Sequence, residues 1–207
     1  MFPDPPIKPD IVAIGASAGG LEAIIGILRR LPANLSASVL VVLHRSPFAI
    51  SHLPEILGRN SQLEVRLAEE REALKHGVCL VSPPDRHLTV TPDLRIHLLP
   101  DGFYRGHSID ALFNSLARCA GPRTIGVVLS GMLRDGALGL KSIKEGGGIA
   151  LVQDPKTAEH SEMPNNAMQF AGPLDCVGSP RELAADLCRR IGYVAAEIAP
   201  ARSAYGP

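Results

Sequence analysis

The chain has 207 residues, 45% of them hydrophobic, and its 21 basic residues balance its 21 acidic ones. This length suits one domain with a sizeable core, and the balanced charge gives no bulk attraction to nucleic acid or to an acidic membrane surface. The Pro-rich N-terminal segment, residues 1–10, lacks the basic stretch and apolar core of a secretory signal, and no apolar run is long enough to cross a bilayer. A cytoplasmic protein without membrane insertion is expected.

The four cysteines lie far apart along the chain, and no two of them form a Cys-x-x-Cys pair. This spacing argues against a zinc site or a redox motif and predicts reduced cysteines that act as small core residues. No metal and no cofactor is expected. The residues are Cys79, Cys119, Cys176 and Cys188.

Continuous apolar runs alternate with amphipathic patterns in chain order. The runs predict buried strands, at Ile11–Gly15, Val39–Leu43, Val78–Val81, Thr124–Leu129 and Ile149–Val152. The amphipathic segments predict helices, at Leu21–Leu31, around Ser51–Leu57, from Ser108, which can cap its helix, at Ala137–Lys144, and from the capping box Ser179–Glu182 to about Ile191. In Leu88–Leu99, apolar and polar residues alternate on both sides of a turn at Pro92–Asp93, and this pattern predicts an antiparallel hairpin.

Apolar strands separated by helices predict an α/β fold, with a doubly wound, mainly parallel sheet, helices on both faces and one antiparallel hairpin. The catalytic domain is expected to span residues 11–192, followed by a loose tail at 193–207. In such sheets, sites gather at the carboxyl ends of the strands.

The first strand runs into Gly15-Ala16-Ser17-Ala18-Gly19-Gly20, a Gly-x-Ser-x-Gly segment before a helix. A serine on such a tight turn is exposed as a nucleophile, and the helix that follows offers unpaired N–H groups for an oxyanion. The alternative is a glycine-rich turn whose serine only caps the helix.

Two further strands end in groups that could assist this serine. His44 ends the second strand and is well placed as a general base. Asp135 follows the strand from Thr124 in a glycine-flanked loop, where it could orient His44 or simply cap the next helix. Since all three residues end strands of one sheet, we expect Ser17, His44 and Asp135 to share one crevice as a catalytic triad.

These segments resemble the catalytic domain of the chemotaxis protein-glutamate methylesterases, the CheB family, from about Ile11 to Ile191. The matching pieces are Gly15 to Gly20, His44 with Pro47, Ser82 to Leu88, Ser108 to Phe113, Ser130 to Met132, Asp135 to Ala137, Gln153 to Pro155, and Met163 with Pro164.

The resemblance implies a serine hydrolase that removes methyl groups from glutamate methyl esters on chemoreceptors and releases methanol; some members of the family also deamidate glutamine. It implies Ser17 as nucleophile, His44 as base and Asp135 as its orienter. The backbone N–H of Met132 is an expected oxyanion donor, and Ala18 and Gly19 shape the site. The implied partner is the methylated helical cytoplasmic region of chemoreceptors, and a separate receiver or methyltransferase protein is a further candidate.

Several positions depart from the family pattern. Ala18 stands where a threonine is common, Leu133 where a glycine often follows the methionine, and His107 where a proline is frequent. Family members usually carry an N-terminal receiver domain, whereas about ten residues precede the first strand here. Activity without phosphorylation of this chain is therefore expected.

Three other readings compete with the methylesterase. A dinucleotide-binding module would need a glycine where Ser17 stands and an acidic residue where His44 stands. An ordinary α/β-hydrolase would use Ser17, Asp135 and His160, but its nucleophile follows several strands. A degenerate domain that acts as a binding or regulatory partner is the third, which Ala18 and Leu133 keep open.

Overall fold

A computed structural model of the chain describes residues 8, 10–46, 52–100 and 106–193. Most of the Pro-rich segment at 1–10 and of the tail expected at 193–207 lies outside the described residues, as do Pro47 and Ser51. No helix in the described ranges is long and apolar enough to cross a membrane.

The described residues form a seven-stranded parallel sheet in the order β3-β4-β2-β1-β7-β8-β9. The most buried strands are nearly unbroken runs of apolar residues, as expected for a parallel sheet covered on both faces. The bounds are β1 Ile11–Ala16, β2 Ser38–Leu43, β3 Glu64–Leu67, β4 Val78–Val81, β7 Thr124–Val128, β8 Ile149–Gln153 and β9 Cys176–Gly178.

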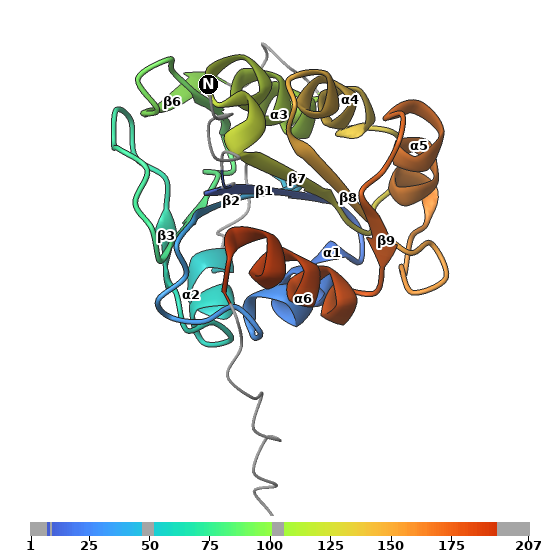
Figure 1. Cartoon of the computed structure of the whole chain (residues 1–207). Coiled ribbons are helices and arrows are strands. Elements are labelled where there is room, and N and C mark those ends of the chain that lie inside the picture. Colours follow the sequence, from blue (N-terminus) through green and yellow to red (C-terminus); the bar gives the residue numbers. More distant parts are fainter. Residues whose placement is uncertain (1–7, 9, 47–51, 101–105, 194–207) are drawn as a thin grey trace, which may run out of the picture.

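Helices cover both faces of this sheet, with α1, α2 and α6 on one side and α3, α4 and α5 on the other (Figure 1). This arrangement confirms the predicted doubly wound α/β fold. The helices are α1 Gly20–Leu28, α2 Leu53–Gly58, α3 Ser108–Cys119, α4 Ala137–Glu145, α5 Glu162–Phe170 and α6 Pro180–Ile191, with a short 3-10 turn at Gly121–Arg123.

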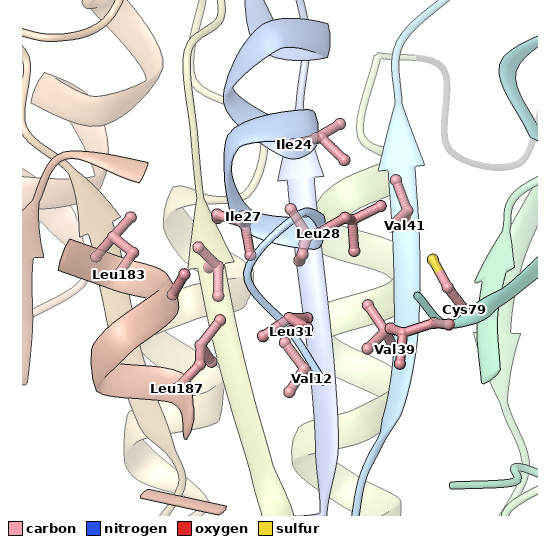
Figure 2. Packing of buried hydrophobic residues seen from close by; sticks show 14 of the residues in the cluster. Val12, Ile24, Ile27, Leu28, Leu31, Val39, Val41, Cys79, Leu183 and Leu187 are labelled. Atoms are coloured by element: carbon pink, nitrogen blue, oxygen red, sulfur yellow. The ribbon is translucent and has the colours of Figure 1, made fainter. Parts of the chain in front are cut away.

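Each face of the sheet has its own hydrophobic cluster. On one face, α1 directs Ile24, Ile27 and Leu28 onto the strands (Figure 2). Leu31 lies just beyond the helix and is also fully buried, so the apolar period predicted for Leu21–Leu31 continues past the helix end. Each such side chain contributes roughly 1.5–3 kcal/mol when it is removed from water. This packing fixes the strand ends that carry the site.

The predicted hairpin is confirmed as an antiparallel pair, β5 Arg86–Val90 and β6 Ile96–Pro100. It packs beside α3, where the backbone N–H of Val90 donates a 3.0 Å hydrogen bond to the Ser115 hydroxyl. The capping box predicted for the last helix is also present, since the side chains of Ser179 and Glu182 both bond to the helix end.

Two strands and one α-helix were not predicted from the sequence. The edge strands β3 and β9 have only four and three residues, and each mixes exposed with more buried positions, so neither gives an apolar run. Helix α5 has few buried residues, Met163, Pro164 and Ala167. The predicted cap of α3 was wrong, because Ser108 is the first residue of the helix and its hydroxyl makes no capping bond.

Candidate active site

Ser17 lies on the turn between β1 and α1, directly after the last residue of the central strand. Its backbone N–H donates to the Ser130 carbonyl at 3.0 Å, which ties the turn to the end of β7. Gly19, with φ of 68°, precedes the first helical residue, and no side chain caps the helix. The alternative role of Ser17 as a helix cap is therefore wrong, and its half-buried side chain is left for other chemistry.

His44 follows β2 in the position next to Ser17. Ala16 pairs with Leu43 across the two parallel strands, and the N–H of His44 donates to the Ala16 carbonyl at 3.0 Å. The register therefore brings the two residues that follow the strands side by side. The Ser17 hydroxyl makes no hydrogen bond to another described residue. Its proton-transfer contact with His44 thus stays a prediction, and such contacts are often looser before substrate binds.

Asp135 reaches His44 from the loop between β7 and α4. Its Oδ2 lies 2.8 Å from His44 Nε2, and the Asp135 side chain is 2% exposed against 28% for His44. Each carboxylate oxygen also accepts a backbone N–H from the first turn of α3, from Ile109 at 2.8 Å and from Asp110 at 2.9 Å. Asp135 therefore caps α3, whereas the sequence suggested that it might cap the helix after it; that helix, α4, has Gly136 at its cap position.

The position of Asp135 decides which nitrogen of His44 is free. An ionised carboxylate only accepts hydrogen bonds, so the proton on His44 belongs on Nε2, and Nδ1 keeps its lone pair. A base with its lone pair free and its other N–H bound to a buried carboxylate can take a proton from a neighbouring hydroxyl. This is the chemistry that the three residues can perform.

Backbone donors stand next to the turn. The N–H groups of Ala18 and Met132 make no hydrogen bond to other described residues. The loop of Met132 passes close to Ser17, since a Cβ at Gly131 would lie 2.8 Å from Ser17 Cβ. Ala18 has no side-chain hydroxyl, so the hydrogen bond that a threonine could give there is missing. Two free amides near a nucleophile are suited to an oxyanion.

Three polar residues, two buried and one half-buried, support the site and were not assigned roles from the sequence. The Ser130 hydroxyl donates to the Ala18 carbonyl at 2.9 Å and accepts from the His160 N–H at 2.9 Å. Arg45 donates to the Ser82 carbonyl at 2.5 Å and joins the ends of β2 and β4. Burial lowers the pKa of Arg45 from its ordinary value. In the sequence, Ser130 directly follows an apolar run and Arg45 comes one residue after another such run, which is the signal that pointed to them.

Asp110 is the third of these residues and lies in the first turn of α3, where its own N–H donates to Asp135. Its Oδ1 accepts the N–H of Gly139 at 2.6 Å, which joins α3 to α4. Burial raises the pKa of Asp110, the charge of Asp135 adds to the rise, and the Gly139 N–H and His107 act against it. Among the described residues, His107, Asp110 and Asp135 are also the one group whose ligand atoms are close enough to surround a metal ion. Three of the four carboxylate oxygens there already accept backbone N–H groups, so the group serves the helix ends.

A cavity of about 210 Å³ opens on one side of His44, between the ends of β2 and β4 and the start of α3. Arg45, Arg86 and His87 are among the residues that line it. Part of the segment Ser82 to Leu88, which resembles the CheB family, also lines this cavity. The backbone of His160, the alternative base, is bonded to Ser130 and Gly131, whereas its ring lies beside Glu159, with Nε2 3.6 Å from the carboxylate.

Known proteins match both the sequence and the fold. A profile of the CheB methylesterase family matches residues 12–187. A relative from Leptospira interrogans is 36% identical over 177 residues, which cover 84% of this chain and 91% of that protein. A protein-glutamate methylesterase/protein-glutamine glutaminase from Pyrococcus abyssi is 35% identical over 181 residues, covering 83% of this chain and 49% of that protein.

A second enzyme of that name, numbered 2, from Pseudomonas aeruginosa is 36% identical over 180 residues and is covered to 51% of its length. The chain thus spans about half the length of the Pyrococcus and Pseudomonas proteins. The crystal structure of the Thermotoga maritima CheB methylesterase catalytic domain superposes with a TM-score of 0.79 at 28% identity, over 88% of this chain and 99% of that one. The resemblance seen in the sequence is confirmed, and the chain belongs to the CheB methylesterase family.

Proposed function

We propose that this protein is a serine hydrolase that cleaves glutamate methyl esters on chemoreceptors and releases methanol. The observation that carries the proposal is the 2.8 Å contact between His44 and the buried Asp135, beside a serine that the strand register places next to His44. The names of the Pyrococcus and Pseudomonas relatives support the substrate class.

In the first half of the reaction, the Ser17 hydroxyl attacks the ester carbonyl while Nδ1 of His44 takes its proton. The imidazolium that forms is stabilised by Asp135, which itself stays ionised. Collapse of the tetrahedral intermediate breaks the bond to the methoxy group, and His44 returns the proton to the leaving methanol. Ser17 is then acylated by the glutamate side chain.

In the second half, water replaces methanol and is activated by the same base. The N–H groups of Ala18 and Met132 donate to the oxyanion in both tetrahedral intermediates, where such donors are worth most. The free carboxylate of the glutamate leaves and Ser17 regains its proton. Attack on a glutamine side chain would give the same acyl-enzyme with ammonia as leaving group, so one site serves both reactions that the relatives' names carry.

The substrate that we propose is the methylated helical region of a chemoreceptor on the cytoplasmic side, which places this protein in the cytoplasm. Support comes from the exposure of the site, since the His44 side chain is 28% exposed and Met132 is 48% exposed. A separate receiver or methyltransferase protein is a further candidate partner. A side chain that projects from a helix can enter such an open site without a large rearrangement of the enzyme.

The test is methanol release from a methylated chemoreceptor, measured as initial rates for the wild-type protein and for Ser17→Ala and His44→Ala. Both substitutions should abolish most turnover while thermal melts stay unchanged. His160→Ala is the matched control and should keep most of the activity, since the contacts of His160 with Ser130 and Gly131 are made by its backbone and its ring lies beside Glu159. Near-normal turnover in Ser17→Ala would refute the serine mechanism, and no methanol release by the folded wild type would favour a binding role.

A further inference from the structure

The loop after β7 contains a leucine whose backbone conformation is unfavourable for a residue with a side chain. Leu133 has φ of 67°, in the left-handed region that favours glycine. The residue is 72% exposed, so its side chain is not packed firmly enough to hold the backbone in place. The conformation must therefore be maintained by contacts of the backbone itself.

Both polar groups of the Leu133 backbone are bound by side chains of α5. The N–H donates to Glu162 Oε2 at 2.9 Å, and the carbonyl accepts from Asn166 Nδ2 at 2.7 Å. Glu162 and Asn166 are four residues apart, so they stand one above the other on the same face of the helix. We call this pair of side chains the α5 latch.

The other end of the loop is bound to the same part of the chain. The Gly131 carbonyl accepts from the Met163 N–H at 2.9 Å, and the Gly131 N–H donates to the His160 carbonyl at 3.0 Å. In a trans peptide the C=O and the next N–H point in opposite directions. Because the Gly131 carbonyl faces α5, the N–H of Met132 points away from that helix and remains free.

We infer that Glu162 and Asn166 are positioning residues that hold the left-handed backbone at Leu133 and thereby orient the Met132 N–H as an oxyanion donor. The inference rests on the proposed function for the role of Met132. It links two features of this chain. A leucine stands where the family often has glycine, and α5 supplies the hydrogen bonds that hold the leucine backbone in the left-handed conformation. With glycine at this position, the backbone would reach the same shape without steric cost.

The experiment measures kcat and KM for methanol release in Glu162→Ala and Asn166→Ala. We expect kcat to fall at least ~10-fold in each, with KM changed less than about two-fold. A displaced oxyanion donor stabilises the transition state less and leaves substrate binding nearly unchanged. Glu162→Gln keeps an acceptor oxygen and should retain most activity. Asn166→Asp loses the donor and should behave like Asn166→Ala. The control is Asn165→Ala, the same change at an exposed neighbour, since the side chains that bond to the Leu133 backbone are those of Glu162 and Asn166.

The decisive step repeats both alanine substitutions in the Leu133→Gly background. If the latch serves to hold the backbone, glycine makes it dispensable, and each substitution should then cost less than about two-fold in kcat. Equal losses in both backgrounds, or no loss of kcat in the original one, would overturn the inference. Thermal melts of every variant separate these results from unfolding.

A second readout separates this inference from the proposed substrate. An alkyl fluorophosphonate ester loses fluoride when the Ser17 oxygen attacks its phosphorus, and its phosphoryl oxygen occupies the oxyanion position, so no receptor is needed. Slower labelling of Ser17 in the latch variants, restored by Leu133→Gly, would support the latch even if no methyl ester is cleaved. Unchanged labelling rates would contradict the latch even if methanol release is normal in the wild type.

Discussion

Asp135 makes three hydrogen bonds, two to the first turn of α3 and one to the candidate base. The helix amides hold a negative charge at this point, because the N-terminus of a helix carries unpaired N–H groups and the positive end of its dipole. The fold thus fixes the position of the carboxylate, and Asp135 Oδ2 accepts a further hydrogen bond from His44 Nε2. A single carboxylate therefore links the stability of α3 to the orientation of the imidazole.

Asp135→Asn tests both parts of this role. We expect kcat to fall by as much as ~10⁴-fold, since an amide nitrogen facing Nε2 would favour the wrong tautomer of His44. Loss of the charged cap should also lower the free energy of unfolding by about 1 kcal/mol. Methanol release and urea unfolding of the same preparation measure the two effects. Turnover within ten-fold of the wild type would remove Asp135 from the mechanism.

Asp110 makes stability depend on pH in a predictable direction. Burial raises its pKa above the ordinary 3.8, so the folded protein holds this proton more tightly than the unfolded chain does. Wild-type stability therefore loses this contribution as the pH rises from below 3.8 through the folded pKa, and the loss persists at neutral pH.

Asp110→Asn removes that titration and keeps an oxygen to accept the Gly139 N–H. The free energy of unfolding of the variant, relative to the wild type, should therefore increase between about pH 3.5 and about pH 7, a range that begins just below the ordinary carboxyl pKa. Urea unfolding at both pH values measures this difference. A relative stability that stays constant, or that falls toward neutral pH, would contradict the assignment.

At the scale of elements, the sequence predicted the buried parts of the fold well. Strands such as β1 and β7 are runs of apolar residues, and the predicted strand ends correctly put Ser17 and Asp135 in the loops that follow them.

Prediction from the sequence failed where an element depends on tertiary contacts. Strand β9 pairs with β8, and α5 binds the loop of Gly131. The capping of α3 by a residue 26 positions away from Ile109 has no local signal either.

Helix α5 and the end of β7 approach each other so closely that only glycine fits between them. A Cβ at Gly131 would overlap the buried sulfur of Met163 and lie 2.8 Å from Ser17 Cβ. Gly131→Ala should therefore cost about 1–3 kcal/mol of stability and lower kcat, because Met163 and the Ser17 turn must both shift. Gly58→Ala is the control, since its Cβ would meet only Val65, at 3.8 Å. Full activity with unchanged stability in Gly131→Ala would refute this tight packing.

At the scale of the whole molecule, the site lies where the order of the strands reverses. From β1 the sheet extends to β2, β4 and β3 on one side and to β7, β8 and β9 on the other (Figure 1). The loops after β1 and β7 leave toward opposite faces at this point, which opens space beyond the carboxyl ends of the strands. Ser17 follows β1, His44 follows β2 and Asp135 follows β7, so the winding of the sheet alone brings them to one place.

Cys79 offers a measure of how far this sheet behaves as one cooperative unit. It lies on β4 inside the sheet, it is fully buried, and burial raises the pKa of its thiol to about 12. Alkylation needs an accessible thiolate, so Cys79 should react with iodoacetamide last of the four cysteines, and only after the sheet opens. Peptide mass spectrometry measures each rate.

Leu28→Ala distinguishes global unfolding from local opening of the sheet as the event that exposes the Cys79 thiol. Leu28 belongs to the same hydrophobic cluster but lies on α1, so the substitution weakens the whole domain by about 2–5 kcal/mol without touching the edge of the sheet. If Cys79 reacts through global unfolding, its alkylation should accelerate at least ~30-fold, since each 1.4 kcal/mol is a factor of ten. The rates at the partly exposed Cys119 and Cys176 should stay the same. An unchanged rate at Cys79 would mean that β3 and β4 detach locally, and that the half of the sheet beyond His44 opens independently of the strands that carry Ser17 and Asp135.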